Sequence, residues 1–213
     1  MSIERERAWY RDVMAGRLGG VVWGEDGDAA LTGPADAEAW VREREAAAAF
    51  TATAAGYPWP EMRLSLSRLL AAHRASVGHV AYSWGAKPSG ALLPGMLHRA
   101  DCSGYVGWLL YRATGGQTDW TGRGTWHLRR FLEAGGYKAS SPALAGLEDG
   151  ALRVAVTVSV PGFPVGHVAL VYQGETLECA GGGRGVCSRP WVPDGWQRRA
   201  RVFVLARAAA LAL

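Results

Sequence analysis

The sequence lacks any apolar run of about 18 residues, so it predicts no membrane-spanning helix and no membrane insertion. Its N-terminal stretch, MSIERERAWYRDV, is charged and has no apolar core, unlike a secretory signal, so synthesis in the cytoplasm without a signal peptide is expected. No block of five or six basic residues occurs, and the net charge of +4 is spread along the chain. These absences disfavour nucleic acid as a partner.

Cysteine is scarce, with only Cys102, Cys179 and Cys187 among 213 residues. Three unevenly spaced cysteines are too few for a disulfide scaffold, and at least one thiol stays unpaired within a monomer. No C-x-x-C pair indicates a zinc site. The sequence therefore predicts neither a metal ion nor another cofactor.

Hydrophobic residues, by contrast, make up 49% of the chain and charged residues 20%, which is typical of a soluble globular protein. The ten Trp and 29 Gly fit a chain rich in turns with an exposed aromatic groove, although a large core would also explain the Trp. The length suffices for one domain of ordinary size plus an accessory segment.

Residues 1–74 form the predicted accessory or docking segment, which is mainly helical. A helix is expected at 35–55, a Gly-Pro-rich break at 56–60, and a second helix that ends near Gly78. The segment contains no chemical motif. An alternative is that its helices cover an apolar face of the following domain, as four tryptophans would suit: Trp9, Trp23, Trp40 and Trp59.

Residues 75–213 are expected to form an α+β domain. Helices are predicted at 101–113 and 125–134, and a short strand or extended loop at 80–84. From residue 152 to 160, apolar and polar residues alternate, which predicts a strand with one buried face. Further strands are expected at 166–172, 176–180, 186–188 and 201–206. Helices followed by antiparallel strands define an α+β layer fold.

Cys102 is the candidate nucleophile, because it lies in the sequence Asp-Cys-Ser-Gly at the start of a predicted helix. Asp101 is a good N-cap, which places Cys102 in the first turn. There the helix dipole and unpaired N–H groups favour a thiolate and could also bind an oxyanion. A lone cysteine is more often a small buried residue, and that interpretation stays open at this point.

His167 is the candidate general base, since a nucleophilic thiol needs a base within hydrogen-bond reach. If Gln173 and Gly174 form a two-residue turn, alternation places His167 and Glu178 on the same face as diagonal neighbours. Glu178 could then orient the imidazole, whereas a three-residue turn would move it to the opposite face. The other histidines are interpreted as structural: His73, His79, His98 and His127.

These elements together resemble the NlpC-type cell-wall cysteine peptidases (the NlpC and p-sixty family), a branch of the papain-like fold. The resemblance spans residues 76–207. It rests on four runs: Tyr82-Ser83-Trp84-Gly85, Asp101-Cys102-Ser103-Gly104-Tyr105-Val106, Gly166-His167-Val168-Ala169-Leu170 and Leu177-Glu178-Cys179-Ala180. It implies that Cys102 is the nucleophile, His167 the base and Glu178 the residue that orients the base.

The resemblance also implies that Tyr82 lies near the cysteine. Trp84, Asp101 and Ser103, from the same motifs, are further candidates for substrate or oxyanion binding. The chain departs from the family at Ala86, where a second Gly is usual, at Ala151, where Asp is frequent, and at Glu178, where His is common. The implied activity is cleavage of amide bonds in peptidoglycan stem peptides, often between D-glutamate and the diamino acid.

Two alternatives remain from the sequence. A related amidase would cut the bond between muramic acid and L-alanine with the same Cys-His pair. A non-catalytic component of a phage tail would keep the fold for packing alone and would have other tail proteins as partners. An enzyme of this kind would act on the cell wall, delivered through a holin as an endolysin or carried on a virion or tail particle.

Overall fold

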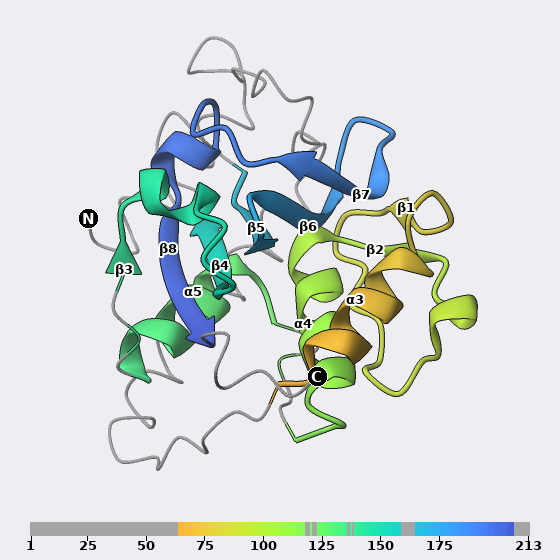
Figure 1. Cartoon of the computed structure of the whole chain (residues 1–213). Coiled ribbons are helices and arrows are strands. Elements are labelled where there is room, and N and C mark those ends of the chain that lie inside the picture. Colours follow the sequence, from red (N-terminus) through yellow and green to blue (C-terminus); the bar gives the residue numbers. More distant parts are fainter. Residues whose placement is uncertain are drawn as a thin grey trace, which may run out of the picture.

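The computed structural model of the chain describes residues 64–117, 120, 123–135, 137, 139–158 and 165–206. Within these ranges, helices precede a mostly antiparallel sheet (Figure 1), so the α+β class predicted from the sequence is confirmed. No helix in the described part is long and apolar enough to cross a membrane. The helix predicted at 35–55, the break at 56–60 and the four N-terminal tryptophans lie outside the described residues.

The helices begin and end where the sequence supplies local signals. They are α3 (Leu66–Arg74), α4 (Cys102–Ala113) and α5 (Thr125–Ala134). The carboxylate of Asp101 caps α4 by accepting the N–H of Gly104 at 2.6 Å, as the Asp-Cys-Ser-Gly motif predicts. The predicted bounds of α4 and α5 are confirmed, while α3 ends at Arg74, short of Gly78.

The main sheet has six strands in the order β3-β8-β4-β5-β6-β7, and Figure 1 places them beside the helices. The strands are β3 (Ala139–Ser140), β4 (Leu152–Thr157), β5 (His167–Tyr172), β6 (Glu175–Ala180), β7 (Gly185–Pro190) and β8 (Arg201–Ala206). A separate parallel pair joins β1 (Ala81–Tyr82) to β2 (Arg99–Ala100). Three 3₁₀ turns complete the described elements: η1 (Pro94–Met96), η2 (Pro142–Gly146) and η3 (Gln197–Arg199).

The β5–β6 hairpin has the two-residue turn that the sequence analysis assumed. Gln173 and Gly174 both have positive φ, 51° and 73°, as a type I′ turn requires. Tyr172 pairs with Glu175 as predicted, and Leu170 pairs with Leu177. The turn therefore sets the register that decides which face Glu178 occupies.

The sheet separates two hydrophobic clusters. Alternate residues of β4 and β5, among them Val154 and Leu170, join α3, α4 and α5 in the larger one. The intervening residues, such as Ala155 and Ala169, pack against Trp191 and the residues around η2 and η3. The sheet is thus covered on both faces.

This second layer corrects the prediction that the strand at residues 152–160 has one buried face. Every residue of β4 is buried, including Arg153, whose guanidinium pairs with Asp149 at 2.5 Å. The alternation of polar residues indicated that one face of this strand is exposed to solvent. The segments 142–146 and 191–199 cover that face. Ser159 and Val160 of the predicted strand lie outside the described residues.

The predicted division between residues 74 and 75 falls inside a packed structure. Helix α3 lies against α4 (Figure 1), and its residues Leu66 and Leu69 belong to the larger cluster, as does Leu64 before it. The core of the domain therefore extends upstream to at least Leu64. The division predicted after Arg74 thus separates residues that pack together, because the apolar face of α3 completes the core.

Gly104, in the first turn of α4, is required by a close backbone approach. A Cβ at this position would lie 2.4 Å from the carbonyl oxygen of Ala86. That oxygen accepts the N–H of Asp101 at 2.9 Å, so the loop before β2 is held against the start of the helix. Ala86 itself fits where a second glycine is usual, because the positive φ of this turn falls on Gly85.

We expect Gly104→Ala to lower the free energy of unfolding by about 1–3 kcal/mol, since an overpacked site must shift backbone atoms. Gly95→Ala is the matched control, because a Cβ there meets nothing within 4 Å. Its effect should stay within about 0.5 kcal/mol. Urea unfolding followed by tryptophan fluorescence measures both, and equal stability of the two variants would contradict the close approach.

Candidate active site

The N-terminus of α4 presents Cys102, a residue with only 4% of its surface exposed. As the first helical residue after the Asp101 cap, it lies where N–H groups have no partner within the helix. The side chain of Cys102 also lies close enough to that of His167, the first residue of β5, to help raise the pKa of the imidazole. The structure therefore brings the predicted nucleophile and the predicted base together.

His167 is held from its backbone and from its ring. Its N–H donates to the hydroxyl oxygen of Thr157 on β4 at 3.0 Å, and that hydroxyl approaches its carbonyl oxygen at 3.4 Å. The imidazole also packs against the ring of Trp196 in a T-shaped arrangement, with 4.5 Å between ring centroids. These contacts leave the ring little freedom to rotate, as a positioned base requires.

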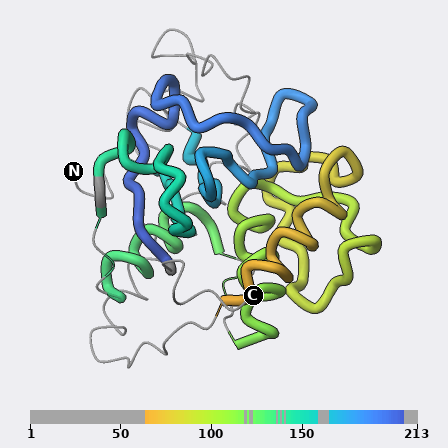
Figure 2. The backbone as a smooth tube through the Cα atoms, viewed as in Figure 1, coloured from red at the N-terminus to blue at the C-terminus, as the bar shows by residue number. Residues whose placement is uncertain are grey.

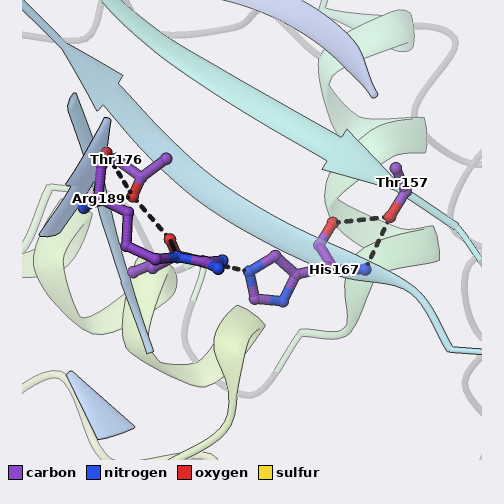
Figure 3. Close-up of polar contacts among 5 residues, drawn as sticks. Thr157, His167, Thr176 and Arg189 are labelled. Carbon is purple, nitrogen blue, oxygen red and sulfur yellow. Dashed lines mark hydrogen bonds and ion pairs between the residues drawn. The ribbon is translucent and has the colours of Figure 1, made fainter. Parts of the chain in front are cut away.

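Glu178, on β6, is the third residue of the predicted triad. Its Oε2 lies 2.6 Å from Nε2 of His167, so the diagonal arrangement predicted from the hairpin is confirmed. The hydroxyl of Thr176 donates to Oε1 at 2.6 Å, and the guanidinium of Arg189 donates to both carboxylate oxygens at 2.9 and 3.2 Å. Figure 3 shows the ring of His167 pointing toward Thr176 and Arg189 and away from Thr157.

The electrostatics around His167 favour the imidazolium form of its ring. Burial alone would lower the pKa of His167, but hydrogen bonds and charge from Cys102 and Glu178 outweigh it and raise the pKa well above its usual value. Burial would likewise raise the pKa of Glu178, yet contacts with His167, Arg189 and Thr176 hold it below its usual range. Glu178 therefore stays ionised beside His167.

The other two cysteines lie in environments that suppress thiolate formation. Burial raises the pKa of Cys179, whose thiol donates to the carbonyl oxygen of Ala100 at 3.3 Å. Burial also raises the pKa of Cys187 on β7. All three cysteines are free thiols. Of the three, only Cys102 combines a helix N-terminus with a histidine partner.

Asp101 and Ser103 flank the candidate nucleophile and share a cation that the sequence analysis did not single out. The ammonium of Lys87 lies 2.6 Å from Asp101 Oδ2 and donates to Ser103 Oγ at 2.5 Å. Both partners are buried, and Ser103 also donates to the other oxygen of Asp101 at 3.2 Å. These contacts hold the first turn of α4 in place. The side chains of Asp101 and Ser103 therefore support the structure beside Cys102.

Tyr82 and Trp84 lie on and just after β1. Tyr82 is half-buried and pairs through its backbone with Ala100, two residues before Cys102, while its side chain packs against the larger hydrophobic cluster. Trp84 follows in a turn with 37% of its surface exposed. The predicted proximity of Tyr82 to the start of α4 is confirmed at the level of the backbone.

His73 and His127 are buried and remain outside the site, as predicted. The ring nitrogens of His73 bond to the hydroxyls of Tyr105 at 2.8 Å and Ser188 at 2.9 Å. Burial lowers the pKa of each histidine to about 4, so both are neutral near pH 7. His73 instead links α3 to α4 and β7.

Thr157, Thr176 and Arg189 support His167 and Glu178, and none of the three was predicted from the sequence. The position of Thr176 could have been predicted, since strand alternation puts it on the same face as Glu178. Arg189 depends on the β6–β7 register, in which Thr176 pairs with Arg189 across a glycine-rich turn. No local signal determines that pairing.

Comparisons with protein-family models, with curated proteins and with solved structures find no match for this chain. Within the described ranges, no group of three or more His, Cys, Asp or Glu side chains is arranged to hold a metal ion.

Replacing Glu178 by Gln should shift the titration of His167 to lower pH, because the change removes the carboxylate charge that helps to raise the pKa. Glu175→Gln at the exposed start of β6 is the matched control and should leave the titration unchanged. NMR of ¹⁵N-labelled histidine across a pH series gives the readout without a substrate. An unchanged His167 titration in Glu178→Gln would refute the electrostatic role of Glu178.

Proposed function

We propose that this chain is a cysteine peptidase with a papain-like, NlpC-type fold that hydrolyses amide bonds in the peptide stems of peptidoglycan. One observation carries the proposal: the imidazole of His167 lies beside Cys102 and bonds to Glu178, which is the order of a nucleophile, a base and an orienting carboxylate. The substrate class comes from the resemblance of the surrounding motifs to the NlpC-type family. The helical and antiparallel layers are compatible with that fold.

In the first step, the thiolate of Cys102 attacks the carbonyl carbon of the scissile amide and forms a tetrahedral intermediate. The imidazolium of His167 then gives its proton to the leaving nitrogen as the C–N bond breaks. The products of this step are a free amine and a thioester on Cys102. Glu178 stabilises the imidazolium before the transfer and keeps Nε2 of the ring engaged throughout.

In the second step, neutral His167 removes a proton from water, and the resulting hydroxide attacks the thioester carbonyl. Collapse of this intermediate breaks the C–S bond, releases a carboxylic acid and restores the thiolate and the imidazolium. The reaction consumes one water and needs no metal or redox partner. The buried, hydrogen-bonded Glu178 favours the return of the ring to the imidazolium state.

Both intermediates place negative charge on the former carbonyl oxygen. The backbone N–H groups in the first turn of α4 point toward this region and can stabilise the oxyanion. The N–H of Gly104 is engaged by Asp101, so the donors available in this proposal are those of Cys102 and Ser103. Tyr82 and Trp84 are the proposed side chains that contact the substrate peptide.

Product analysis tests the function directly. Purified peptidoglycan incubated with the protein should release fragments with new amines, and mass spectrometry of the fragments identifies the bond that is cut. A new amine on the diamino acid supports the endopeptidase, whereas a new amine on L-alanine with free muramic acid carboxylates would assign the amidase. Peptidoglycan that remains uncut would refute both enzymes and favour a non-catalytic tail component.

Delivery to the cell wall completes the proposal, with passage through a holin or transport on a virion or tail particle as the two routes. Copurification with tail particles discriminates between them, because an endolysin is released as a separate protein. The other tail proteins would then be its partners.

A further inference from the structure

Lys87 bonds to the residues on both sides of Cys102, and no step of the proposed reaction uses it. Its ammonium lies 2.6 Å from Oδ2 of Asp101 and donates to Oγ of Ser103 at 2.5 Å. The hydroxyl of Ser103 in turn donates to the other oxygen of Asp101 at 3.2 Å. A cation is therefore fixed at the start of α4, where the candidate nucleophile also lies.

The segment that contains Lys87 is anchored along α4 at two points. The carbonyl oxygen of Ala86 accepts the N–H of Asp101 at 2.9 Å, and that of Leu92 accepts the indole N–H of Trp108 at 2.9 Å. Figure 2 shows this yellow to yellow-green segment on the same side of the molecule as α4. The ammonium of Lys87 therefore reaches Asp101 from a backbone that is already held in place.

The charge of Asp101, taken by itself, works against a thiolate at Cys102. The carboxylate accepts the N–H of Gly104 at 2.6 Å and so occupies the positive end of the helix dipole. It is also buried, where charges interact more strongly than they do in water. Burial is the main cause that raises the pKa of Cys179 on β6, and the charges of Cys102 and Asp101 add to it. The charge of Asp101 thus acts on a thiol of another element, and Cys102 is its neighbour in the chain.

Other titratable groups lie on the elements around the start of α4. They are Tyr82 on β1, His98 and Arg99 at β2, His73 on α3, His167 on β5, and Glu178 and Cys179 on β6. Burial lowers the pKa of His73 to about 4, so this ring is neutral near pH 7. The two groups at β2 are exposed, so solvent and salt screen their charges. Lys87, in contrast, offsets the charge of Asp101 by direct contact.

We propose that Lys87 is a positioning residue that neutralises Asp101 and thereby leaves the positive end of α4 available to the thiolate of Cys102. Asp101 then caps the helix without repelling the nucleophile, and the bond from Lys87 to Ser103 holds the turn in the same arrangement. The role rests on the proposed function, because it concerns the nucleophile of that reaction. Lys87 acts through Asp101 and takes no part in bond cleavage.

The test measures how the alkylation rate of Cys102 by iodoacetamide depends on pH, with mass spectrometry of the peptide to assign the rate in the full-length chain. Lys87→Met should raise the midpoint, the pH of half-maximal rate, by about one unit, since Asp101 is then unopposed. Asp101→Asn should lower the midpoint by a similar amount, because Asn still caps the helix but has no charge. The double variant should return close to the wild-type midpoint, and Lys87→Arg should keep it.

Arg99→Gln is the matched control, because it removes an exposed cation close to Cys102 in the sequence and should leave the midpoint unchanged. A wild-type midpoint in Lys87→Met overturns the role. A rate that falls by the same factor at every pH also overturns it, because that result indicates support of the fold alone. If Lys87→Met fails to fold, an unchanged midpoint in Asp101→Asn overturns the role instead.

The same series separates this role from the proposed function, because alkylation needs no substrate. A wild-type chain that leaves peptidoglycan uncut, while the midpoints shift as expected, refutes the function and supports the role of Lys87. A wild-type chain that cuts peptidoglycan, while the midpoints of all variants coincide, supports the function and overturns the role.

Discussion

Cys102→Ala should reduce the hydrolysis of purified peptidoglycan by on the order of 10⁵-fold, since no other group can form the thioester intermediate. The fold should persist, because the change removes one sulfur atom from a site where His167 and Glu178 keep their mutual hydrogen bond. Release of stem-peptide fragments, followed by chromatography over time, measures the loss. His167→Ala should cause a loss of similar size, as members of one catalytic unit fail together.

Cys187→Ala provides the matched control, because Cys187 is a free thiol on β7 with no proposed role in the reaction. Its activity should equal that of the wild type. Iodoacetamide should alkylate Cys102 faster than Cys179 or Cys187, whose pKa values are raised by burial. Hydrolysis by Cys102→Ala near the wild-type rate would eliminate Cys102 as the nucleophile.

Removal of residues 1–73 should abolish the cooperative unfolding transition. A chain that begins at Arg74 loses Leu64, Leu66 and Leu69 from the core, together with the bonds from His73 to Tyr105 and Ser188. Each buried leucine contributes about 2–5 kcal/mol when truncated, and a typical domain is stable by only about 5–15 kcal/mol. Differential scanning calorimetry should therefore find no transition, and the chain should aggregate.

Point variants in the full-length chain give the same test without a deletion. Leu69→Ala, at a fully buried position of α3, should lower the free energy of unfolding by about 2–5 kcal/mol. Leu93→Ala, at a position that is 53% exposed, should change it by less than about 0.5 kcal/mol. A shortened chain that melts cooperatively and cleaves peptidoglycan would show instead that α3 is accessory.

Local signals in the sequence were enough for most of the candidate site. An N-capping Asp101 predicted the start of α4 and thereby the position of Cys102. Two residues with turn chemistry, Gln173 and Gly174, set the hairpin register, and strand alternation then placed His167 and Glu178 on one face. Each inference depended on neighbours within a few residues, where backbone geometry leaves few choices.

Other features could not be obtained in this way, because they depend on which distant segments meet. The alternation along β4 predicted one exposed face, but the segment around Trp191 covers it. The apolar spacing of α3 predicted a helix, but it did not show that this helix packs against α4. Both errors concern burial, which is a property of the partners of an element and not of its own sequence.

The sequence by itself thus predicted which residues would meet at the candidate site, Cys102, His167 and Glu178, and the bounds of α4 and α5, since short-range hydrogen bonding and side-chain periodicity specify them. Only the tertiary structure decided that Arg189 and Thr176 hold Glu178, that Lys87 braces the turn beside Cys102, and that α3 completes the core. The physical reason is that these contacts join segments separated by long loops, whose relative positions are set by the packing of the whole chain.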